Sequence, residues 1–234
     1  MIAIENLVVQ FGGVRPIDNL TATISAPVSG LIGPNGAGKT TLLNVLSGFV
    51  SPAAGRVAVD GRDLLALHPL GRVKSGLRRS FQTEQVVEDL TVAGNLFAIA
   101  DHVVAPSERA AAVDAALAFT NLRSAAHTLG RALNLFQRRL VELSKCLIGQ
   151  PRLVLLDEPA AGLTNEESTT LREMILRIPG ELGAQVLLID HDVELIRSMC
   201  TETLVLDYGR MLALGPTEEV LASPDVRRAY LGEF

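Results

Sequence analysis

Residues 33–41 have the composition and spacing of a phosphate-binding loop. The pattern G-x-x-x-x-G-K-[ST] supplies glycines that let the backbone curl, so that several N–H groups can face an anion. Its lysine adds a positive charge for the outer phosphates, and its hydroxyl suits Mg²⁺, a hard cation that takes few protein ligands. The residues predicted to bind a nucleotide here are Gly33, Pro34, Asn35, Gly36, Ala37, Gly38, Lys39, Thr40 and Thr41.

The segments on either side of this loop support the same interpretation. The apolar run from Val28 predicts a strand, and the spacing of Leu42, Leu43 and Leu46 predicts a helix over Lys39–Phe49. The alternative is an ordinary glycine-rich turn with an exposed lysine. A strand that enters the loop and a helix that leaves it favour phosphate binding, because the positive end of the helix dipole then faces the anion.

A second chemical feature is the acidic pair Asp157-Glu158, which follows four apolar residues, Leu153–Leu156. A phosphate-binding loop needs a carboxylate at the end of such a strand to hold Mg²⁺, and Asp157 fits that role. Glu158 points in a different direction and can polarise the water that attacks the γ-phosphate. The alternative is a solvated acidic pair in front of a proline.

The elements that must position these residues alternate along the chain. Apolar strands separated by helical stretches predict an α/β fold with a mostly parallel sheet covered on both faces, and a glycine turn near the N-terminus predicts an antiparallel β part. The predicted strands are Ile2–Val9, Leu20–Ala26, Val28–Ile32, Arg56–Val59, Leu77–Gln82, Leu153–Leu156, Gln185–Ile189 and Thr203–Leu206.

Between residues 83 and 150 the strand pattern is replaced by alanine-rich helical segments, predicted at Thr91–Ala100, Ser107–Asn121 and Asn134–Gly149. We therefore expect a nucleotide-binding core made of residues 1–82 and 151–234, with an inserted helical subdomain over residues 83–150.

Composition narrows the functional classes. The net charge of −5 argues against a nucleic-acid-binding protein, although Arg78-Arg79 and Arg138-Arg139 are candidate local basic patches. Cys146 and Cys200 lie in apolar stretches and are expected to be buried thiols rather than a disulfide. No basic N-terminal region and no run of about 18 apolar residues is present, which predicts neither a signal peptide nor a membrane span.

Taken in order, the motifs resemble those of the ATP-binding-cassette ATPases, the motor subunits of membrane transporters. This resemblance implies a P-loop NTPase (RecA-like) core. The resemblance covers essentially the whole chain. It rests on a Walker A stretch, a Walker B stretch, a Q-loop glutamine and a switch histidine, at Gly33–Thr41, Leu153–Glu158, Gln82 and His191. Five further segments resemble the branched-chain amino-acid importer subfamily: Phe11–Gly13, Arg79–Gln82, Glu158–Leu163, Asp190–Asp192 and Pro224–Gly232.

The resemblance implies roles for three further residues. Gln82 would contact Mg²⁺ or the attacking water, unless it is simply a glutamine in solvent. His191 would bridge the γ-phosphate and Glu158, unless it only begins a helix beside two aspartates. Phe11 would stack on adenine, because every base offers a π face; the alternative is a core phenylalanine.

The chain departs from the family at a second motif, Leu-Ser-Gly-Gly-Gln, which contacts the ATP held by the partner subunit. Here that place reads Leu133–Gln137, and the stripe Phe136, Leu140, Leu143, Leu147 confirms the helical register after it. Asn134 is a good N-cap. Leu135 and Phe136 stand where the family motif has two glycines, which let backbone N–H groups approach a phosphate closely, and their side chains add bulk there.

The family works as a head-to-tail pair of cassettes, so each ATP site combines one chain's Walker residues with the other chain's signature motif. We therefore expect a second ATP-binding subunit that differs from this one and carries an intact signature. Thr164 stands where the family commonly has aspartate, and Thr164–Glu167 is predicted to be a helix-capping box.

The function that the resemblance implies is Mg²⁺-dependent ATP hydrolysis that energises import of branched-chain amino acids or related small solutes. The chain would lie at the cytoplasmic face of the inner or plasma membrane and would not touch the solute. Permease subunits would contact the region after Gln82, where Val86, Val87, Leu90, Val92 and Phe97 are either a docking surface or subdomain core. The alternatives are a catalytically weak regulatory cassette, a non-transport cassette ATPase and a small-molecule P-loop kinase.

Overall fold

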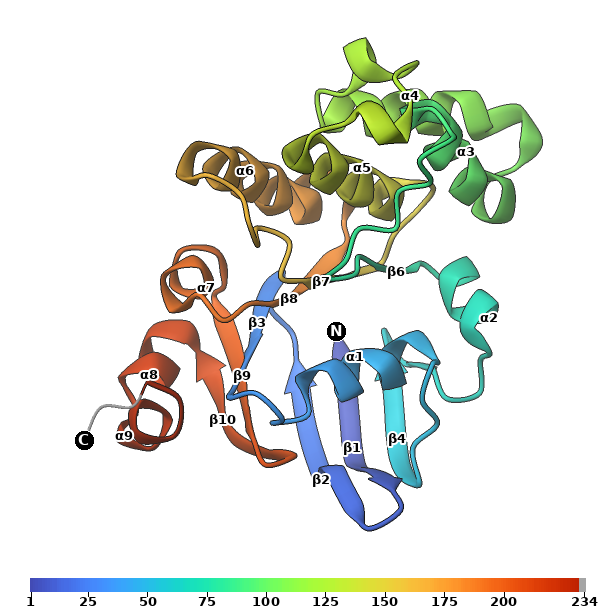
Figure 1. Cartoon of the computed structure of the whole chain (residues 1–234). Helices are drawn as coiled ribbons and strands as arrows, with labels where there is room; N and C mark the ends of the chain where they lie inside the picture. The colour runs from blue at the N-terminus through green and yellow to red at the C-terminus, as the bar shows by residue number, and fades with distance from the viewer. Residues whose placement is uncertain (232–234) are drawn as a thin grey trace. The chain divides into compact units, whose positions relative to one another are not determined.

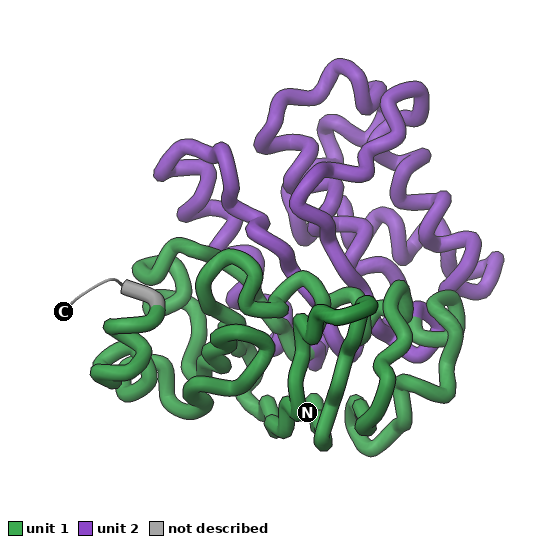
Figure 2. Tube along the Cα trace, turned by 60° about the horizontal axis from the view of Figure 1, so that its bottom comes forward, with its two compact units in different colours: residues 1–72, 185–234 green, residues 73–184 purple. Residues whose placement is uncertain are grey.

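A computed structural model describes residues 1–231, and its internal contacts divide the chain after residues 72 and 184. Unit 1 contains residues 1–72 and those from 185 onward, whereas unit 2 contains residues 73–184 (Figure 2). Gly232, the last residue of the predicted C-terminal subfamily segment, lies outside the described residues.

Unit 1 contains an antiparallel sheet with the strand order β2-β1-β4-β5, and Figure 1 shows β1, β2 and β4 side by side. The predicted hairpin is confirmed: β1 and β2 pair along their length around Gly12-Gly13, with Phe11 opposite Val14. Ile2 and Ile4 are buried, and after a register shift so are Leu7 and Val9, as expected for a strand with one core-facing side. The four strands are β1 (Ile2–Phe11), β2 (Val14–Ile24), β4 (Ala54–Val59) and β5 (Arg62–Asp63).

A second group of strands in unit 1 carries the predicted parallel pairing. β3 pairs in parallel with both β8 and β9, and β10 runs antiparallel to β9. Every residue of β3 and β8 is buried, which accounts for their mostly apolar sequences. These strands are β3 (Val28–Ile32), β8 (Gln185–Ile189), β9 (Glu202–Asp207) and β10 (Arg210–Pro216).

The helices of unit 1 follow its strands, and α1 begins directly after the phosphate-binding loop. Their bounds are α1 (Lys39–Ser47), α2 (Pro69–Lys74, whose last two residues belong to unit 2), α7 (Val193–Met199), α8 (Thr217–Ala222) and α9 (Pro224–Val226), followed by a π-helical turn over Arg227–Leu231.

Unit 2 combines two parallel strands with the predicted helices. The α/β class with an antiparallel part, a mostly parallel part and an α-helical segment is therefore confirmed. The elements are β6 (Leu77–Arg79), α3 (Val92–Val103), α4 (Arg109–Phe119), α5 (Leu135–Leu147), β7 (Leu153–Asp157) and α6 (Asn165–Leu182), with short 3₁₀ turns at Pro106–Glu108, Arg123–Ala125 and Gly130–Ala132.

The predicted strand Leu77–Gln82 is too long. β6 pairs with β7 through only three residues, and the Ser80 N–H then donates to the Leu155 carbonyl oxygen at 2.9 Å. The prediction was wrong because pairing with β7 stops after this bond, so Phe81 and Gln82 are not in the sheet. As a result, Gln82 lies in an irregular segment rather than in a strand.

The basic pairs are not the patches that the sequence suggested. Arg78 is buried, and its guanidinium donates to the carbonyl oxygens of Val73, Leu77 and Ile148. Burial lowers the pKa of Arg78 from its ordinary value. Arg139 is also buried. Both side chains therefore bind backbone oxygens inside the protein instead of presenting charge to a polyanion.

Cys146 and Cys200 are both buried free cysteines, as predicted, and desolvation raises the pKa of each thiol to about 12. Among residues 1–231, no helix is both long enough and apolar enough to span a bilayer.

Candidate nucleotide-binding site

The loop between β3 and α1 adopts a conformation that only glycine accommodates at two of its positions. Gly33 and Gly38 have φ angles of 150° and 103°. A Cβ atom on Gly38 would lie 2.2 Å from the Pro16 carbonyl oxygen, and one on Gly33 would lie 2.1 Å from that of Leu206. The loop is therefore held directly against two backbone segments of unit 1, which leaves no room for side chains.

The same loop fits an anion. α1 begins at Gly38, which offers no side-chain cap, and its first turn contains no acidic residue. Its first N–H groups and the positive end of its dipole are thus directed at whatever occupies the loop. The Lys39 ammonium folds back and donates to the carbonyl oxygens of Gly33 and Pro34, at 2.6 and 3.0 Å. These neutral acceptors can be exchanged for phosphate oxygens.

Phe11 and His191 are exposed residues of unit 1. Phe11, at the end of β1, is 54% exposed, which excludes the core alternative and leaves its ring accessible for stacking. The His191 side chain is 72% exposed, and its Nδ1 lies 3.7 Å from Oδ1 of Asp190. The N-cap of α7 is Asp192, which accepts from the N–H groups of Glu194 and Leu195, so His191 does not cap that helix.

Unit 2 brings together two residues predicted to act in catalysis. The Gln82 amide, Nε2, donates to Oε2 of Glu158 at 3.0 Å. Glu158 has a φ of 48°, a left-handed conformation that is costly for a residue with a Cβ atom. Such conformations gather at functional sites, where the surrounding structure holds a side chain in a required direction.

Asp157, the last residue of β7, is buried and ion-paired. Its Oδ2 lies 3.5 Å from an Nη2 of Arg79, whose guanidinium stacks 4.9 Å from the centre of the Phe81 ring. Burial lowers the pKa of Arg79 from its ordinary value, while the neighbouring Asp157 carboxylate acts in the opposite direction. The site thus offers a carboxylate oxygen of the kind that Mg²⁺ prefers, shared with an arginine that sequence reasoning missed.

The predicted residues fall into two sets. The phosphate-binding loop, Phe11 and His191 belong to unit 1, whereas Gln82, Asp157 and Glu158 belong to unit 2.

Comparison with known proteins identifies the family. Residues 17–161, more than half of the chain, match the family described as ABC transporter. This chain belongs to the ABC transporter family. A second family, described as branched-chain amino acid ATP-binding cassette transporter, matches residues 210–234. The chain is thus an ABC ATPase, in which ATP hydrolysis is coupled to transport.

Full-length relatives support this placement. The chain is 34% identical to the high-affinity branched-chain amino acid transport ATP-binding protein BraF of Pseudomonas aeruginosa, covering 100% of this chain and 98% of that one. It is also 34% identical to LivG of Escherichia coli K12, which has the same description and the same coverage. The crystal structure of MJ1267, an ATP-binding cassette of an ABC transporter in its ADP conformation, is similar with a TM-score of 0.87, 27% identity, and coverage of 100% of this chain and 99% of that one.

Asn134 and Leu135 lie in the segment that the sequence analysis aligned with the family signature. Asn134 caps α5 as predicted: its Oδ1 accepts from the Gln137 N–H at 2.8 Å, and the Asn134 N–H donates to Oε1 of Gln137 at 3.1 Å. The Leu135 side chain packs over Gly162, where its Cδ2 would lie 3.1 Å from an added Cβ atom. The apolar Leu135 side chain therefore lies against the loop that follows Glu158.

The segment after Glu158 is fixed by a second predicted cap. Thr164 and Glu167 form a reciprocal capping box at the start of α6, so the structural role expected for Thr164 is confirmed. The sequence predicted Arg139 only as half of a candidate basic patch and did not indicate its role inside the protein, where its guanidinium donates to the carbonyl oxygens of Gln82 and Ala161.

Proposed function

We propose that this cassette hydrolyses ATP to energise a membrane importer for branched-chain amino acids or related small solutes. The observation that carries the proposal is the match of residues 210–234 to the branched-chain amino acid cassette family. It is supported by relatives that match over 98% of their own length and whose descriptions name branched-chain amino acid transport.

The first part of the chemistry belongs to unit 1. The Gly33–Thr41 loop would bind the phosphates through its N–H groups, and Lys39 would exchange two carbonyl oxygens for phosphate oxygens. The exposed Phe11 ring would stack on adenine. Mg²⁺, when bound with ATP, would offset phosphate charge, and Thr40, Gln82 and Asp157 are the residues that would hold it.

The second part belongs to Glu158 and its neighbours. The Glu158 carboxylate would orient the attacking water and accept its proton, a role that contributes roughly 10²–10⁴-fold to a rate. Gln82 donates to that carboxylate and would orient the same water. His191, with its exposed imidazole, would contact the γ-phosphate from unit 1.

A partner cassette would complete the site. Leu135 and Phe136 replace the two glycines that the family signature provides, and Leu135 packs over Gly162 in this chain. We therefore propose a head-to-tail pair with a non-identical cassette, whose signature motif closes the ATP site built on this chain's Walker residues.

The permease would contact the exposed apolar side chains after Gln82. Val87, Leu90 and Phe97 are 52%, 38% and 38% exposed, whereas Val86 and Val92 are buried and belong to the core of unit 2. Of the five candidates, only Val87, Leu90 and Phe97 would therefore contribute to a docking surface. Contact there would hold the cassette at the cytoplasmic face of the membrane, away from the transported solute.

A catalytically weak regulatory cassette is the second candidate, and the bulk of Leu135 and Phe136 favours it. The two candidates differ in their dependence on Glu158. A regulatory cassette would support transport after Glu158→Gln, because it would need only to bind ATP.

The test is uptake of labelled leucine, isoleucine and valine by cells that lack this chain and carry either the wild type or a variant. Wild type should restore uptake, and Glu158→Gln should not. Val87→Asp should leave the chain off the membrane while it retains its affinity for ATP. Uptake of all three amino acids that is unchanged by deletion would refute the substrate assignment, and unchanged membrane recruitment of Val87→Asp would refute the docking surface.

A further inference from the structure

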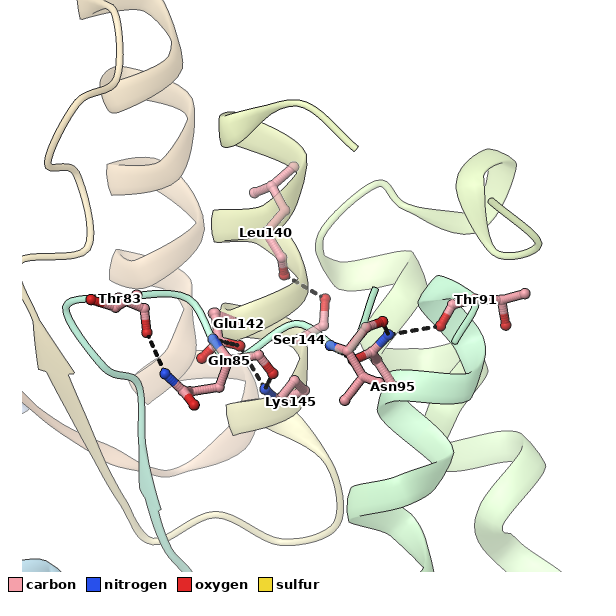
Figure 3. A network of polar contacts seen from close by, with 9 residues as sticks. Thr83, Gln85, Thr91, Asn95, Leu140, Glu142, Ser144 and Lys145 are labelled. Atoms are coloured by element: carbon pink, nitrogen blue, oxygen red, sulfur yellow. Dashed lines mark hydrogen bonds and ion pairs between the residues drawn. The ribbon is translucent and has the colours of Figure 1, made fainter. Parts of the chain in front are cut away.

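The irregular segment 82–87 is held by side chains rather than by secondary structure. The Gln82 carbonyl oxygen accepts from Nη1 of Arg139 at 3.0 Å. The Gln85 N–H donates to Oε1 of Glu142 at 3.1 Å, and the Gln85 carbonyl oxygen accepts from Lys145 at 2.8 Å. Figure 3 shows Glu142 and Lys145 directed at Gln85. Both polar groups of the Gln85 backbone are therefore satisfied by α5.

The three side chains form one row along α5, which we call the α5 polar row (Arg139, Glu142 and Lys145). Their spacing of three residues places them on the same side of the helix. The side chains are only 8%, 5% and 14% exposed, and Lys145 pairs with Glu142 at 2.5 Å. Arg139 also pairs with Glu84 of the held segment at 3.1 Å. Two cations thus face two carboxylates, which is the condition under which buried charges are tolerated.

Arg139 links this segment to the loop that carries the proposed catalytic base. Its Nη2 donates to the Ala161 carbonyl oxygen at 3.2 Å, three residues after Glu158. The Gln82 side chain in turn donates to Glu158. The Arg139 guanidinium therefore fixes both the Gln82 backbone and the loop that carries Glu158 to α5. The side chains of Gln82 and Glu158 are in turn hydrogen-bonded to each other.

The other end of the segment is fixed by α3. The buried Asn95 accepts from the Val87 N–H at 2.8 Å and donates to the Val87 and Thr91 carbonyl oxygens at 3.1 and 3.0 Å. Figure 3 shows Asn95 beside Thr91. Both ends of segment 82–87 are therefore anchored, the first by the α5 polar row and the last by Asn95.

We propose that Arg139 is a positioning residue for ATP hydrolysis. By binding the Gln82 and Ala161 carbonyl oxygens, it holds the Gln82 side chain against Glu158. Glu142 and Lys145 hold the same segment through Gln85. This inference rests on the proposed roles of Gln82 and Glu158. A planar guanidinium can bond two carbonyl oxygens and a carboxylate together, whereas a lysine ammonium at the same place cannot span them with the same geometry.

The test is a double-mutant cycle between Arg139→Met and Gln82→Ala in the full chain, measured as ATP turnover in the assembly in which the chain is active. Arg139→Met should lower kcat by about 10- to 100-fold, because misplacement of a catalytic group by about 1 Å costs that much. The KM for ATP should change less than threefold, since the phosphate-binding loop lies in unit 1. In the Gln82→Ala background, Arg139→Met should have no further effect.

Arg139→Lys should recover part of the lost turnover. The matched control is Asp89→Asn, which removes an exposed 2.8 Å ion pair with Arg131 from the same stretch and should leave kcat unchanged. If Arg139→Met does not fold, Glu142→Gln combined with Lys145→Met removes both charges at once and should lower kcat in the same direction, because the bond to the Gln85 carbonyl oxygen is lost.

Additive losses in the cycle, or a fall in thermal stability without a fall in kcat, would overturn the inference and leave the α5 polar row as a structural brace. Failure of the proposed function gives a different result. In that case Gln82→Ala alone would leave kcat unchanged, and the cycle would show no loss of kcat that Gln82 and Arg139 could share.

Discussion

Gly38→Ala is expected to destabilise the cassette more than Gly36→Ala, although both glycines lie in the same loop. Gly36 and Gly38 have φ angles of 83° and 103°, so alanine at either position adopts a left-handed conformation that costs about 1–2 kcal/mol. The two positions differ in their surroundings. An added Cβ meets nothing within 4 Å at Gly36 but lies 2.2 Å from the Pro16 carbonyl oxygen at Gly38.

The backbone contribution to the loss of stability is similar in the two variants. The difference between their free energies of unfolding therefore reports the contact between the added Cβ and the Pro16 carbonyl oxygen. Forcing an extra carbon into a packed site costs about 1–3 kcal/mol. For a chain of this size, 1 kcal/mol corresponds to about 2–4 °C in Tm, so Gly38→Ala should melt roughly 2–12 °C below Gly36→Ala.

The assay is thermal unfolding of both variants without nucleotide, followed by titration with a fluorescent ATP analogue. Gly38→Ala should also bind the analogue more weakly, because relief of the contact moves the start of α1. Equal melting temperatures for the two variants would refute the argument that β2 fixes the loop through Gly38.

Three further predictions follow from the described residues. Glu158→Gln should bind ATP with unchanged affinity but lower turnover roughly 10²–10⁴-fold, as measured by phosphate release; a loss below threefold would remove Glu158 from the chemistry. Thr164→Ala should lower the free energy of unfolding by about 1 kcal/mol in urea melts, because it removes the capping box of α6, and an unchanged midpoint would show that the cap is not stabilising. Burial raises the pKa values of Cys146 and Cys200 to about 12, so both carry almost no thiolate at pH 8. Both should resist a thiol reagent in the native protein and react in denaturant. Rapid labelling of the native chain would contradict their burial.

The features that the sequence predicted well depend on neighbouring residues. The loop between β3 and α1, the box at Thr164–Glu167 and the cap at Asn134 each involve groups a few positions apart, so residue type and spacing are sufficient. The mostly apolar strands β3, β7 and β8 were equally visible, because burial on both faces leaves only one polar residue in each: Ser29, Asp157 and Gln185.

The features that were missed depend on distant backbone. Arg139 reaches carbonyl oxygens 57 and 22 residues away, and Arg78 reaches one 70 residues away. Every residue carries a carbonyl oxygen, so no residue type marks an acceptor in advance. For the same reason, a pair of arginines in the sequence suggested a surface patch, when one of the two is a buried donor.

The central claim is that this chain supplies the Walker half of an ATP site and that a different cassette supplies the signature. The most direct measurement is ATP turnover by the purified chain alone and after mixing with a second cassette of the same importer that carries an intact Leu-Ser-Gly-Gly-Gln. Turnover should appear in the mixture. It should persist when the partner's own catalytic glutamate is neutralised, and it should fall when Glu158→Gln is then introduced into this chain. Robust turnover by the purified chain alone would contradict the claim.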